Sequence, residues 1–482
     1  PNAEWKREYR FSFSRPMVEG MPLVTREYHD GFYLSQKLES WYASMNRYAA
    51  YVDQWRGYTP RNPSPWALSP CWSVAWTLWS PPELNKGEKG WMQKIIEEQA
   101  PLAKEMGFDI IHLEADALEY DLYYETNKTA FSDYQAVKEK LANLGMILEM
   151  HFSTPFSPKG APNFESLKSS LMTTDKEPGG VRAYDAFEIL CPRTREMHED
   201  RVECLEHMIR DMGARSFWID FNDDSFPVKA CTAKHEHAWN TLGEGLDALM
   251  LALTKAAWAI DPNITFISRR SIANINNKSY LTHGCSFDCQ YDQAQQRREA
   301  IFIRSFGPGT VPFAFHGIWA DSEPDTEVAR HMASYCLLMV PVICQDLTRL
   351  SLGCLNVVKA WLKFYKEHAE DIIYGDLEPL VFMPPSAAFK IERNGKAFVG
   401  CFETTPGTIT LMGKPSEIFL FNGVVKDFST RITGVAGKFK GQWLDYQLRP
   451  YGEPFQVTSE NGKMIISGDC PVLPCMLRLN GQ

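Results

Sequence analysis

The sequence lacks several patterns that would assign it to a common class of binding protein. Its 12 cysteines are dispersed and none forms a Cys-x-x-Cys pair, so neither a zinc ribbon nor a zinc finger is indicated. No run approaches the ~20 consecutive apolar residues of a membrane-spanning helix. Lysine and arginine are scattered and the formal net charge is −10, which argues against nucleic acid or a membrane surface as partner. No phosphate-binding motif is evident, and we expect a neutral substrate with no cofactor and no metal.

These absences leave the compartment and the oligomeric state open. The chain begins at Pro1 and shows no visible signal segment. If a signal peptide has been removed, the protein is secreted or periplasmic, and otherwise it is cytoplasmic. A monomer and a homo-oligomer are both compatible with the sequence.

From about residue 70 to 370, short apolar runs alternate with segments of helical period, which is typical of βα units and a parallel sheet. Strands are expected at 74–78, 109–113, 146–150, 216–220, 264–267, 311–315 and 340–344, with a less regular segment before residue 292 in the sixth place. Eight strands over ~250 residues or more favour a (β/α)8 TIM barrel over an open sheet. We therefore predict an α/β fold with a catalytic barrel at residues 70–377.

The segments on either side of the barrel differ in pattern. Asn394-Gly395, Asn422-Gly423 and Asn461-Gly462 each lie between apolar stretches, which is the strongest short-range signal for a β-hairpin. Residues 378–482 are therefore predicted to form a C-terminal antiparallel β-sandwich. Residues 1–69 are expected to form a short β segment and then helical or irregular structure packed on the barrel.

Aromatic residues are abundant, with 14 Trp, 19 Tyr and 28 Phe. Most of them are expected in the core, but the tryptophan-rich stretch 71–79, which contains Trp76, is dense enough to form an exposed platform as well. Apolar ring faces suit the C–H faces of sugars. The composition is therefore compatible with a carbohydrate substrate.

The most informative stretch is 216–224, where an apolar run ends at Asp220 and polar residues follow. Such runs are buried parallel strands, and the residue ending one lies at the C-terminal mouth where barrel enzymes place their chemistry. Carboxylates at strand ends suggest glycoside hydrolysis, in which two carboxyl groups about 5–5.5 Å apart act as nucleophile and as acid/base with retention of configuration. Asp220 is the candidate nucleophile, and Asp288 or Asp292 is the candidate acid/base.

Residues 218–223, Trp-Ile-Asp-Phe-Asn-Asp, resemble the WxDxNE motif of family 31 glycoside hydrolases, with Asp223 where that family has Glu. In that motif the Asp on the fourth strand is the nucleophile. Residues 266–271 resemble the Arg-Ser turn after the fifth strand of the family, and Asp288 falls close to its acid/base Asp. The α-galactosidases of families 36 and 27 have a similar plan. The resemblance covers roughly residues 70–375 and implies membership of the retaining α-glycosidase clan.

This resemblance implies an exo-acting α-galactosidase-like or α-glucosidase-like enzyme. Asp220 would attack the anomeric carbon, while Asp288, or alternatively Asp292, would protonate the leaving oxygen and later activate water. Burial and the charge of Asp220 would raise the pKa of the acid, and Arg269 or Arg270 would keep Asp220 ionised. We expect sugar contacts from residues near strand ends, namely Trp76, Glu114, Asp116, His151, Trp218, Arg269, Arg270, His316 and Trp319.

Two other functions are compatible with the same barrel. A metal-dependent hydrolase would use His112, His151, His316 and Asp220, although the His-x-His pair expected on the first strand of such sites is missing. A catalytically silent carbohydrate-binding protein would keep the barrel and its tryptophans. The presence of both Asp220 and Asp288 favours an enzyme over this binding protein.

Overall fold

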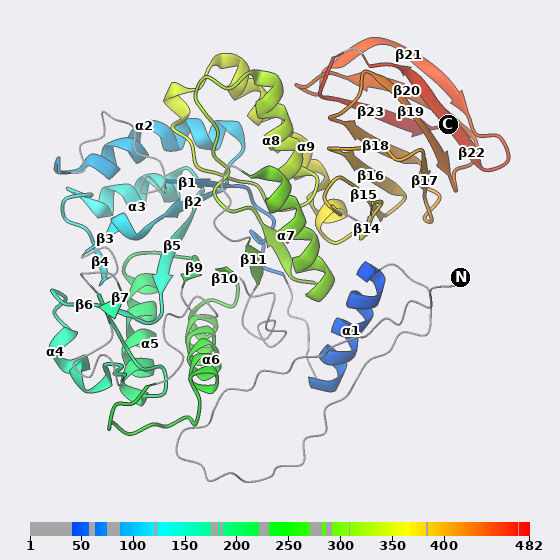
Figure 1. Cartoon of the computed structure of the whole chain (residues 1–482). Coiled ribbons are helices and arrows are strands. Elements are labelled where there is room, and N and C mark those ends of the chain that lie inside the picture. Colours follow the sequence, from blue (N-terminus) through cyan, green and yellow to red (C-terminus); the bar gives the residue numbers. More distant parts are fainter. Residues whose placement is uncertain are drawn as a thin grey trace, which may run out of the picture.

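The computed structural model describes residues 41–56, 63–74, 87–119, 123–174, 182–183, 187–220, 231–269, 282–285, 292–307, 309–381, 384–470 and 472–482. An α/β barrel is followed in the chain by a separate β domain, which lies at its upper right in Figure 1. Both parts agree with the predicted fold class.

The barrel is an eight-stranded parallel sheet in the order β12-β11-β10-β9-β5-β2-β1-β13. Its strands, in chain order, are β1 Cys71–Ser73, β2 Ile110–Leu113, β5 Ile147–Ser153, β9 Ser216–Asp220, β10 Thr265–Arg269, β11 His283–Cys285, β12 Val311–Phe313 and β13 Val342–Ile343. Two parallel bridges, Phe313 to Val340 and Gly317 to Ile343, join the edges of this sheet. The TIM barrel is therefore confirmed, and β9 is its fourth strand.

Amphipathic helices cover the outside of the barrel. They are α2 Trp91–Met106, α3 Tyr134–Asn143, α5 Arg195–Arg210, α6 Leu242–Ile260, α7 Gln293–Phe306, α8 Asp325–Cys336 and α9 Leu352–Ile373. In α2, for example, the apolar residues Met92, Ile96, Ala100 and Ala103 recur at helical spacing and are buried against the sheet. Gly107, with a φ of 114°, ends this helix in the left-handed conformation that glycine adopts readily.

Two barrel strands differ from their predicted positions. The first strand is Cys71–Ser73, before the predicted 74–78, because Cys71 and Trp72 are the residues that pair with both β2 and β13. Residues 75–86 lie outside the described part. The sixth strand is His283–Cys285, and its polar first residue and glycine conceal it from a search for apolar runs. The His283 ring is buried and its Nε2 contacts the carbonyl oxygen of Ala67 at 2.6 Å.

Small additions follow the second and third barrel strands. After β2 come a 3-10 turn at Ala115–Ala117 and a pair of short strands, β3 Leu118–Glu119 and β4 Tyr123–Thr126. Between β5 and α5 the chain forms β6 Phe156–Pro158, α4 Phe164–Leu167, β7 Arg182–Ala183 and β8 Phe187–Ile189. Strands β6, β8 and β7 make an antiparallel sheet. We call this insertion the β5–α5 lobe.

The C-terminal domain has two sheets around its own core. The larger holds β14 Asp376–Pro379, β15 Ala388–Arg393, β16 Lys396–Cys401, β18 Glu417–Asn422, β23 Cys475–Gly481, β20 Lys438–Leu444 and β21 Pro450–Thr458. The smaller holds β17 Thr408–Thr410, β19 Asp427–Thr433 and β22 Lys463–Asp469. The β-sandwich is therefore confirmed. Its pairing is mostly antiparallel, but β16–β18 and β17–β19 are parallel because their connections cross between the sheets.

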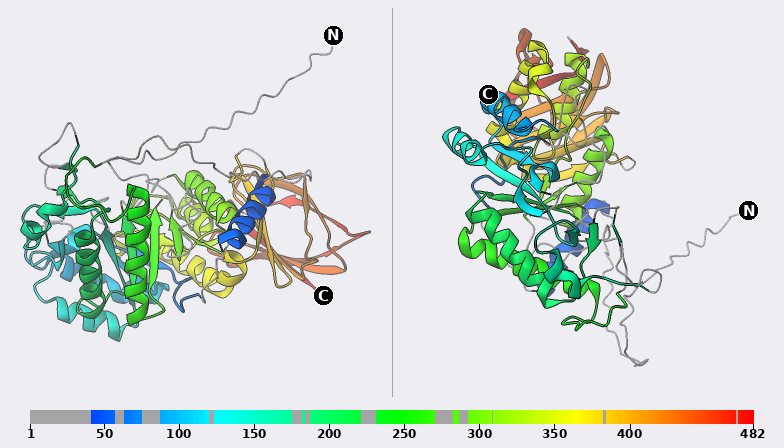
Figure 2. Two further views of the ribbon diagram at one scale, coloured as in Figure 1. Left: turned by 90° about the horizontal axis from the view of Figure 1, so that it is seen from below. Right: turned by 90° about the vertical axis from the view of Figure 1, so that its left-hand side faces the viewer.

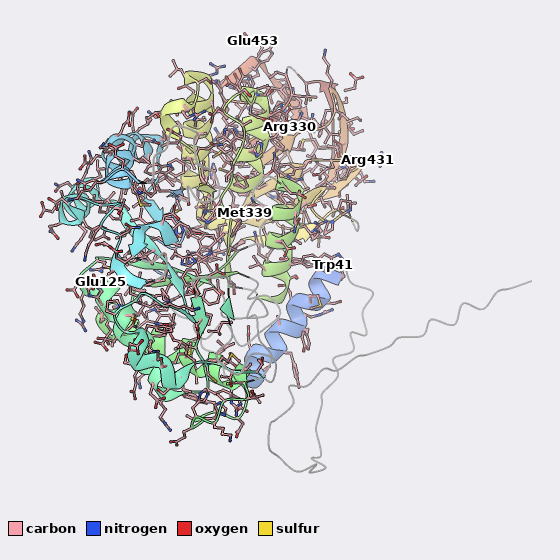
Figure 3. All side chains as sticks on the ribbon, turned by 60° about the vertical axis from the view of Figure 1, so that its left-hand side comes forward. Trp41, Glu125, Arg330, Met339, Arg431 and Glu453 are labelled. Carbon is pink, nitrogen blue, oxygen red and sulfur yellow. The ribbon has the colours of Figure 1, made fainter. Side chains whose placement is uncertain are left out.

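Two of the three Asn-Gly pairs form tight turns and the third does not. Asn394-Gly395 and Asn461-Gly462 adopt the positive φ angles of a type I′ turn, at 49° and 72° and at 51° and 75°. Asn394-Gly395 joins the paired strands β15 and β16 as predicted. Asn461-Gly462 closes only the single bridge between Glu460 and Lys463, because β21 and β22 pair with other strands in different sheets. The hairpin prediction for Asn422-Gly423 is wrong. There the chain leaves β18 for β19 in the other sheet, and the Asn422 Oδ1 accepts from the Val424 amide. The Gly423 carbonyl accepts from Arg330 of α8, a residue that is labelled in Figure 3.

At the N-terminal side, the helix α1, Trp41–Arg56, lies against α7 (Figure 2). The Trp41 ring lies 5.8 Å from that of Phe302 on α7, and Tyr42 joins the barrel core. Residues 1–40, and with them the predicted short β segment, lie outside the described part. Among the residues that are described, none of the helices is long and apolar enough to cross a membrane.

Candidate active site

A chain of polar side chains runs through the barrel interior at one level. The strand register aligns His112 on β2 with Glu149 on β5, Glu149 with Ser216 on β9, and Ser216 with Thr265 on β10. His112 Nδ1 is 3.0 Å from Glu149 Oε1, Ser216 Oγ donates to Glu149 Oε2 at 2.6 Å, and Thr265 Oγ1 donates to Ser216 Oγ at 2.7 Å. All four residues are buried. We call these four residues the lower polar layer.

A second group lies nearer the C-terminal ends of the same strands. Side chains two positions apart on a strand point to the same face, so His151 and Asp220 rise above Glu149 and Trp218 inside the barrel. His151 Nε2 is 3.5 Å from Asp220 Oδ2, and His112 Nε2 is 3.0 Å from Glu114 Oε2. Asp220 is only 6% exposed. The structure therefore brings together Glu114, His151 and Asp220, three residues that the sequence singled out.

Histidine side chains in these two groups lie next to carboxylates, and each affects the pKa of the other. Burial would lower the pKa of His112, but its contacts with Glu114 and Glu149 outweigh this effect and raise it to about 9. His151 is also buried, and the charges of Glu114 and Asp220 raise its pKa. Burial opposes ionisation of Glu114, yet His151, His112 and His316 together hold its pKa well below the ordinary range. The site therefore contains the protonated imidazole of His112 beside the ionised carboxylate of Glu114 at neutral pH.

His316 follows β12 and stacks on Trp218, with ring centroids 4.7 Å apart and planes at 15°. Its φ of 36° is unusual for a residue other than glycine, and such strain gathers at functional sites. The indoles of Trp218 and Trp319 are at most 2% exposed, and Trp319 packs near His331. These two rings lie in the core below and beside the mouth, so a role for them in sugar binding stays a prediction.

Of the remaining predicted site residues, Asp116 and Asp292 are described by the structure and the others are not. Asp116 is buried in the short turn after β2, where its backbone carbonyl accepts a hydrogen bond from Asn127 Nδ2 at 3.2 Å. Asp292 is exposed and caps α7, accepting a hydrogen bond from the Gln295 backbone at 2.8 Å. Trp76, Asp288, Arg270 and the side chain of Arg269 lie outside the described part.

Glu149 is a site residue that the sequence analysis missed, and His112 was considered only as a metal ligand. The signal was present as an alternation of polar residues within apolar strands, as in Glu149-x-His151, His112-x-Glu114 and Ser216-x-Trp218-x-Asp220. A polar residue on the inward face of a buried strand requires a partner, because an unpaired buried charge is costly. Which strand supplies that partner depends on the register, which the sequence alone does not reveal.

His112, Glu114 and His316 offer ligand atoms within 4.8 Å of one another, as the metal-dependent alternative would require. Both ring nitrogens of His112 already face carboxylate oxygens at 3.0 Å. A metal ion needs a neutral imidazole with a free lone pair, whereas the raised pKa of His112 keeps this ring protonated. The contacts therefore favour an ion-pair network over a metal centre here.

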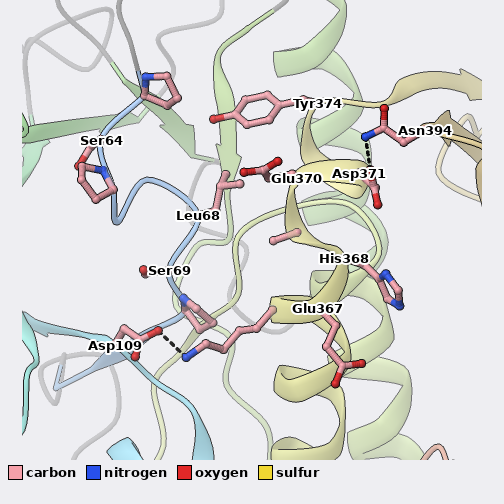
Figure 4. Close-up of a pocket in the computed structure, with 15 residues that line it drawn as sticks. Ser64, Leu68, Ser69, Asp109, Glu367, His368, Glu370, Asp371, Tyr374 and Asn394 are labelled. Carbon is pink, nitrogen blue, oxygen red and sulfur yellow. Dashed lines mark hydrogen bonds and ion pairs between the residues drawn. The ribbon is translucent and has the colours of Figure 1, made fainter.

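The pocket shown in Figure 4 lies at the opposite end of the barrel. Pro70 precedes β1 and Asp109 precedes β2, so this pocket faces the N-terminal ends of the strands. Lys366 on α9 forms an ion pair with Asp109 at 2.6 Å, and Asn394 donates to Asp371 at 2.8 Å. In TIM-barrel enzymes this end serves stability and the opposite end holds the chemistry.

Comparison with solved structures shows the same fold in several glycosidases. An α-amylase from Anoxybacillus matches with a TM-score of 0.58 and 11% identity, over 86% of this chain and 99% of that one. The α-galactosidase from Lactobacillus brevis matches with a TM-score of 0.59 and 12% identity, over 91% and 58% of the two chains. A family 36 α-galactosidase from Geobacillus stearothermophilus gives 0.58 and 12%, over 92% and 58%. At these identities the likeness concerns the fold alone.

The sequence itself gives a more specific result. No curated protein matches the chain. The model of the glycosyl hydrolases family 31 TIM-barrel domain matches residues 89–340, which include Glu114, His151 and Asp220. The chain thus belongs to glycosyl hydrolase family 31, within the retaining α-glycosidase clan, and is a glycosidase.

Proposed function

We propose that this glycosidase is a retaining, exo-acting α-glycoside hydrolase in which Asp220 is the nucleophile. The observation that carries the proposal is the position of the Asp220 carboxylate, buried at the C-terminal end of the fourth barrel strand. His151 Nε2 lies 3.5 Å from it, and the buried pair of His112 and Glu149 lies beneath it. Such a fixed environment holds a nucleophile in one orientation without reorganisation during the reaction.

The acid/base is assigned to Asp288 in preference to Asp292. The Asp292 carboxylate already accepts a hydrogen bond as the N-cap of α7 and is exposed, whereas a general acid at neutral pH requires a raised pKa from burial or a nearby negative charge. This leaves Asp288, which the family resemblance favours. Asp288 would protonate the leaving oxygen while Asp220 attacks the anomeric carbon, and would then activate water for the second step.

The depth of Asp220 supports the exo-acting mode. A nucleophile that is 6% exposed is reached more easily by the end of a sugar chain than by its middle. The family 36 α-galactosidase from Geobacillus stearothermophilus is known in complex with raffinose, so α-galactosides are the first substrates to test, with α-glucosides next.

Asp220→Asn provides the test, because it keeps the shape of the side chain and removes the nucleophilic oxygen. Hydrolysis of nitrophenyl α-glycosides should fall by roughly 10³-fold or more, as for other nucleophile replacements. The circular dichroism spectrum and melting temperature should stay close to those of the wild type. Asp261→Asn, in the turn after α6, is the matched control and should keep full activity. Near-normal turnover by Asp220→Asn would reject the assignment.

A covalent label gives independent evidence. An activated 2-deoxy-2-fluoro α-glycosyl donor slows the second step, so a retaining enzyme accumulates its glycosyl intermediate. Peptide mass mapping should then place the sugar on Asp220. A label on another carboxylate would show that the nucleophile lies elsewhere, and a fully active enzyme that inverts configuration would reject the retaining mechanism.

A further inference from the structure

A second cluster of chemically reactive side chains lies outside the candidate active site. Cys191, Cys231, His235 and His237 offer sulfur and nitrogen atoms that all lie within 4.8 Å of one another. Both cysteines are completely buried and neither forms a disulfide. Two thiols and two imidazoles converging on one point form a donor set that matches the tetrahedral Cys₂His₂ sites of structural zinc.

The distances within this cluster fit such an ion. Zinc lies about 2.3 Å from a cysteine sulfur and about 2.0–2.1 Å from a histidine nitrogen, so a tetrahedral site separates sulfur from nitrogen by about 3.5 Å. The separation between Cys231 Sγ and His235 Nε2 is 3.6 Å. The His235 and His237 rings are 4.6 Å apart at 87°, which lets both face the sulfurs without stacking on each other. Only small side-chain movements would close the remaining distances.

The polarity of the cluster is otherwise difficult to explain. It adjoins an apolar cluster that includes Phe156, Met172 and Leu246. The Nε2 atom of His237 is buried and has no hydrogen-bond partner among the residues that the structure describes. A buried polar atom without a partner is unfavourable by about 1–3 kcal/mol. Coordination to a metal ion would satisfy this nitrogen.

The backbone around the four residues is already held in place. Cys191 follows β8 in the β5–α5 lobe, and its amide donates to the Ser170 carbonyl at 2.8 Å. The segment bearing the other three ligands is fixed at both ends, because the Thr232 amide donates to Thr173 and the Ala238 amide donates to Arg193, both at 2.8 Å. A site whose ligands are supported in this way loses little conformational entropy when it binds a metal.

We infer that Cys191, Cys231, His235 and His237 bind a structural zinc ion that fastens the segment after β9 to the β5–α5 lobe. Four protein ligands leave no open position for water or substrate, so the ion would be structural and not catalytic. Soft thiolates together with imidazoles favour zinc over magnesium or calcium, which prefer oxygen ligands.

Metal analysis of the full chain tests this inference without any use of activity. The chain is produced with zinc in the medium and purified under reducing conditions, and elemental mass spectrometry should then find about one zinc ion per chain. Cys231→Ser and His235→Gln should each lower this content by more than about 10-fold, since even residues behind the ligands are worth about 10- to 100-fold in affinity. The matched controls Cys204→Ser and His207→Gln, on α5, should keep the ion.

Cobalt gives a second measurement that does not depend on the folding of a variant. Wild-type chain stripped by a chelator and titrated with Co²⁺ should show the visible bands of tetrahedral cobalt and a thiolate-to-cobalt charge-transfer band. Zinc should displace the cobalt and raise the melting temperature of the stripped chain. The absence of zinc and of these bands would overturn the inference. So would zinc retained by both ligand variants, or a Cys191–Cys231 disulfide found in the purified protein by non-reducing peptide mapping.

Discussion

His112 and Glu149 lie directly opposite each other on neighbouring barrel strands, and His112 Nδ1 is 3.0 Å from Glu149 Oε1. Neither side chain is exposed to solvent. His112 also contacts Glu114 at the mouth, so one buried imidazole connects the lower polar layer to the group that contains Asp220. The stability of the barrel interior and the geometry of the candidate active site are therefore linked through His112.

This linkage predicts how stability depends on pH. Because the folded-state pKa of His112 is raised from 6.5 to about 9, its contribution is complete below about pH 6.5 and is lost as the pH rises through about 9. A shift of this size corresponds to about 3 kcal/mol. The titratable groups that face His112 are Glu114, Glu149, His151 and His316. Glu114 affects stability at acidic pH. Because its folded-state pKa is lowered, its contribution to the unfolding free energy is complete above the ordinary pKa of a glutamate and is lost as the pH falls through the lowered folded-state pKa.

The measurement is denaturant unfolding of the wild type and of His112→Gln from pH 6 to pH 10. The difference in unfolding free energy should be largest near pH 6 and should shrink toward pH 10, where the wild-type ring is neutral. His207→Gln removes a half-buried histidine on α5 whose carboxylate partner Asp211 is exposed, and should change stability little throughout. A His112→Gln deficit that is constant across this range would mean that packing, and not charge, accounts for the loss.

His151 is predicted to act as a positioning residue for Asp220. His151→Asn removes the imidazole whose Nε2 lies 3.5 Å from the carboxylate, and should lower kcat/KM by roughly 10²-fold, as for other preorganised polar contacts. The basic limb of the pH–activity profile should also move, because Glu114 and Asp220 raise the pKa of His151 in the wild type and extend its protonated form to higher pH. A purely structural role would lower stability and leave the shape of the profile unchanged.

The two candidate acid/base residues can be separated by the leaving group of the substrate. Asp288→Ala should strongly reduce hydrolysis of a natural α-glycoside, while a substrate with an activated phenol needs little protonation and should lose much less. Asp292→Ala should cost about 1 kcal/mol of stability through loss of the α7 cap, with turnover nearly unchanged for both substrates. The reverse pattern would move the acid/base role to Asp292.

Local patterns in the sequence predicted much of this molecule. The order of the βα units followed from apolar runs of strand length between helical segments. Asp220 was placed at the end of the fourth strand because an abrupt change in polarity is visible in a few consecutive residues. The error at Asn422-Gly423 arose because pairing between distant strands is not visible locally. β18 pairs with β16 and β23, so the dipeptide leads to the other sheet and does not form a hairpin.

Tertiary structure decided the features that depend on residues far apart in the chain. The strand register placed Glu149 between His112 and Ser216, and the turns after β2 and β12 brought Glu114 and His316 to the same mouth. The convergence of Cys191 with Cys231, His235 and His237 depends on the path of the β5–α5 lobe. The sequence by itself determined which residues carry chemistry and on which elements they lie, because composition and period are local. Their partners were fixed only when barrel closure and register set the distances between strands.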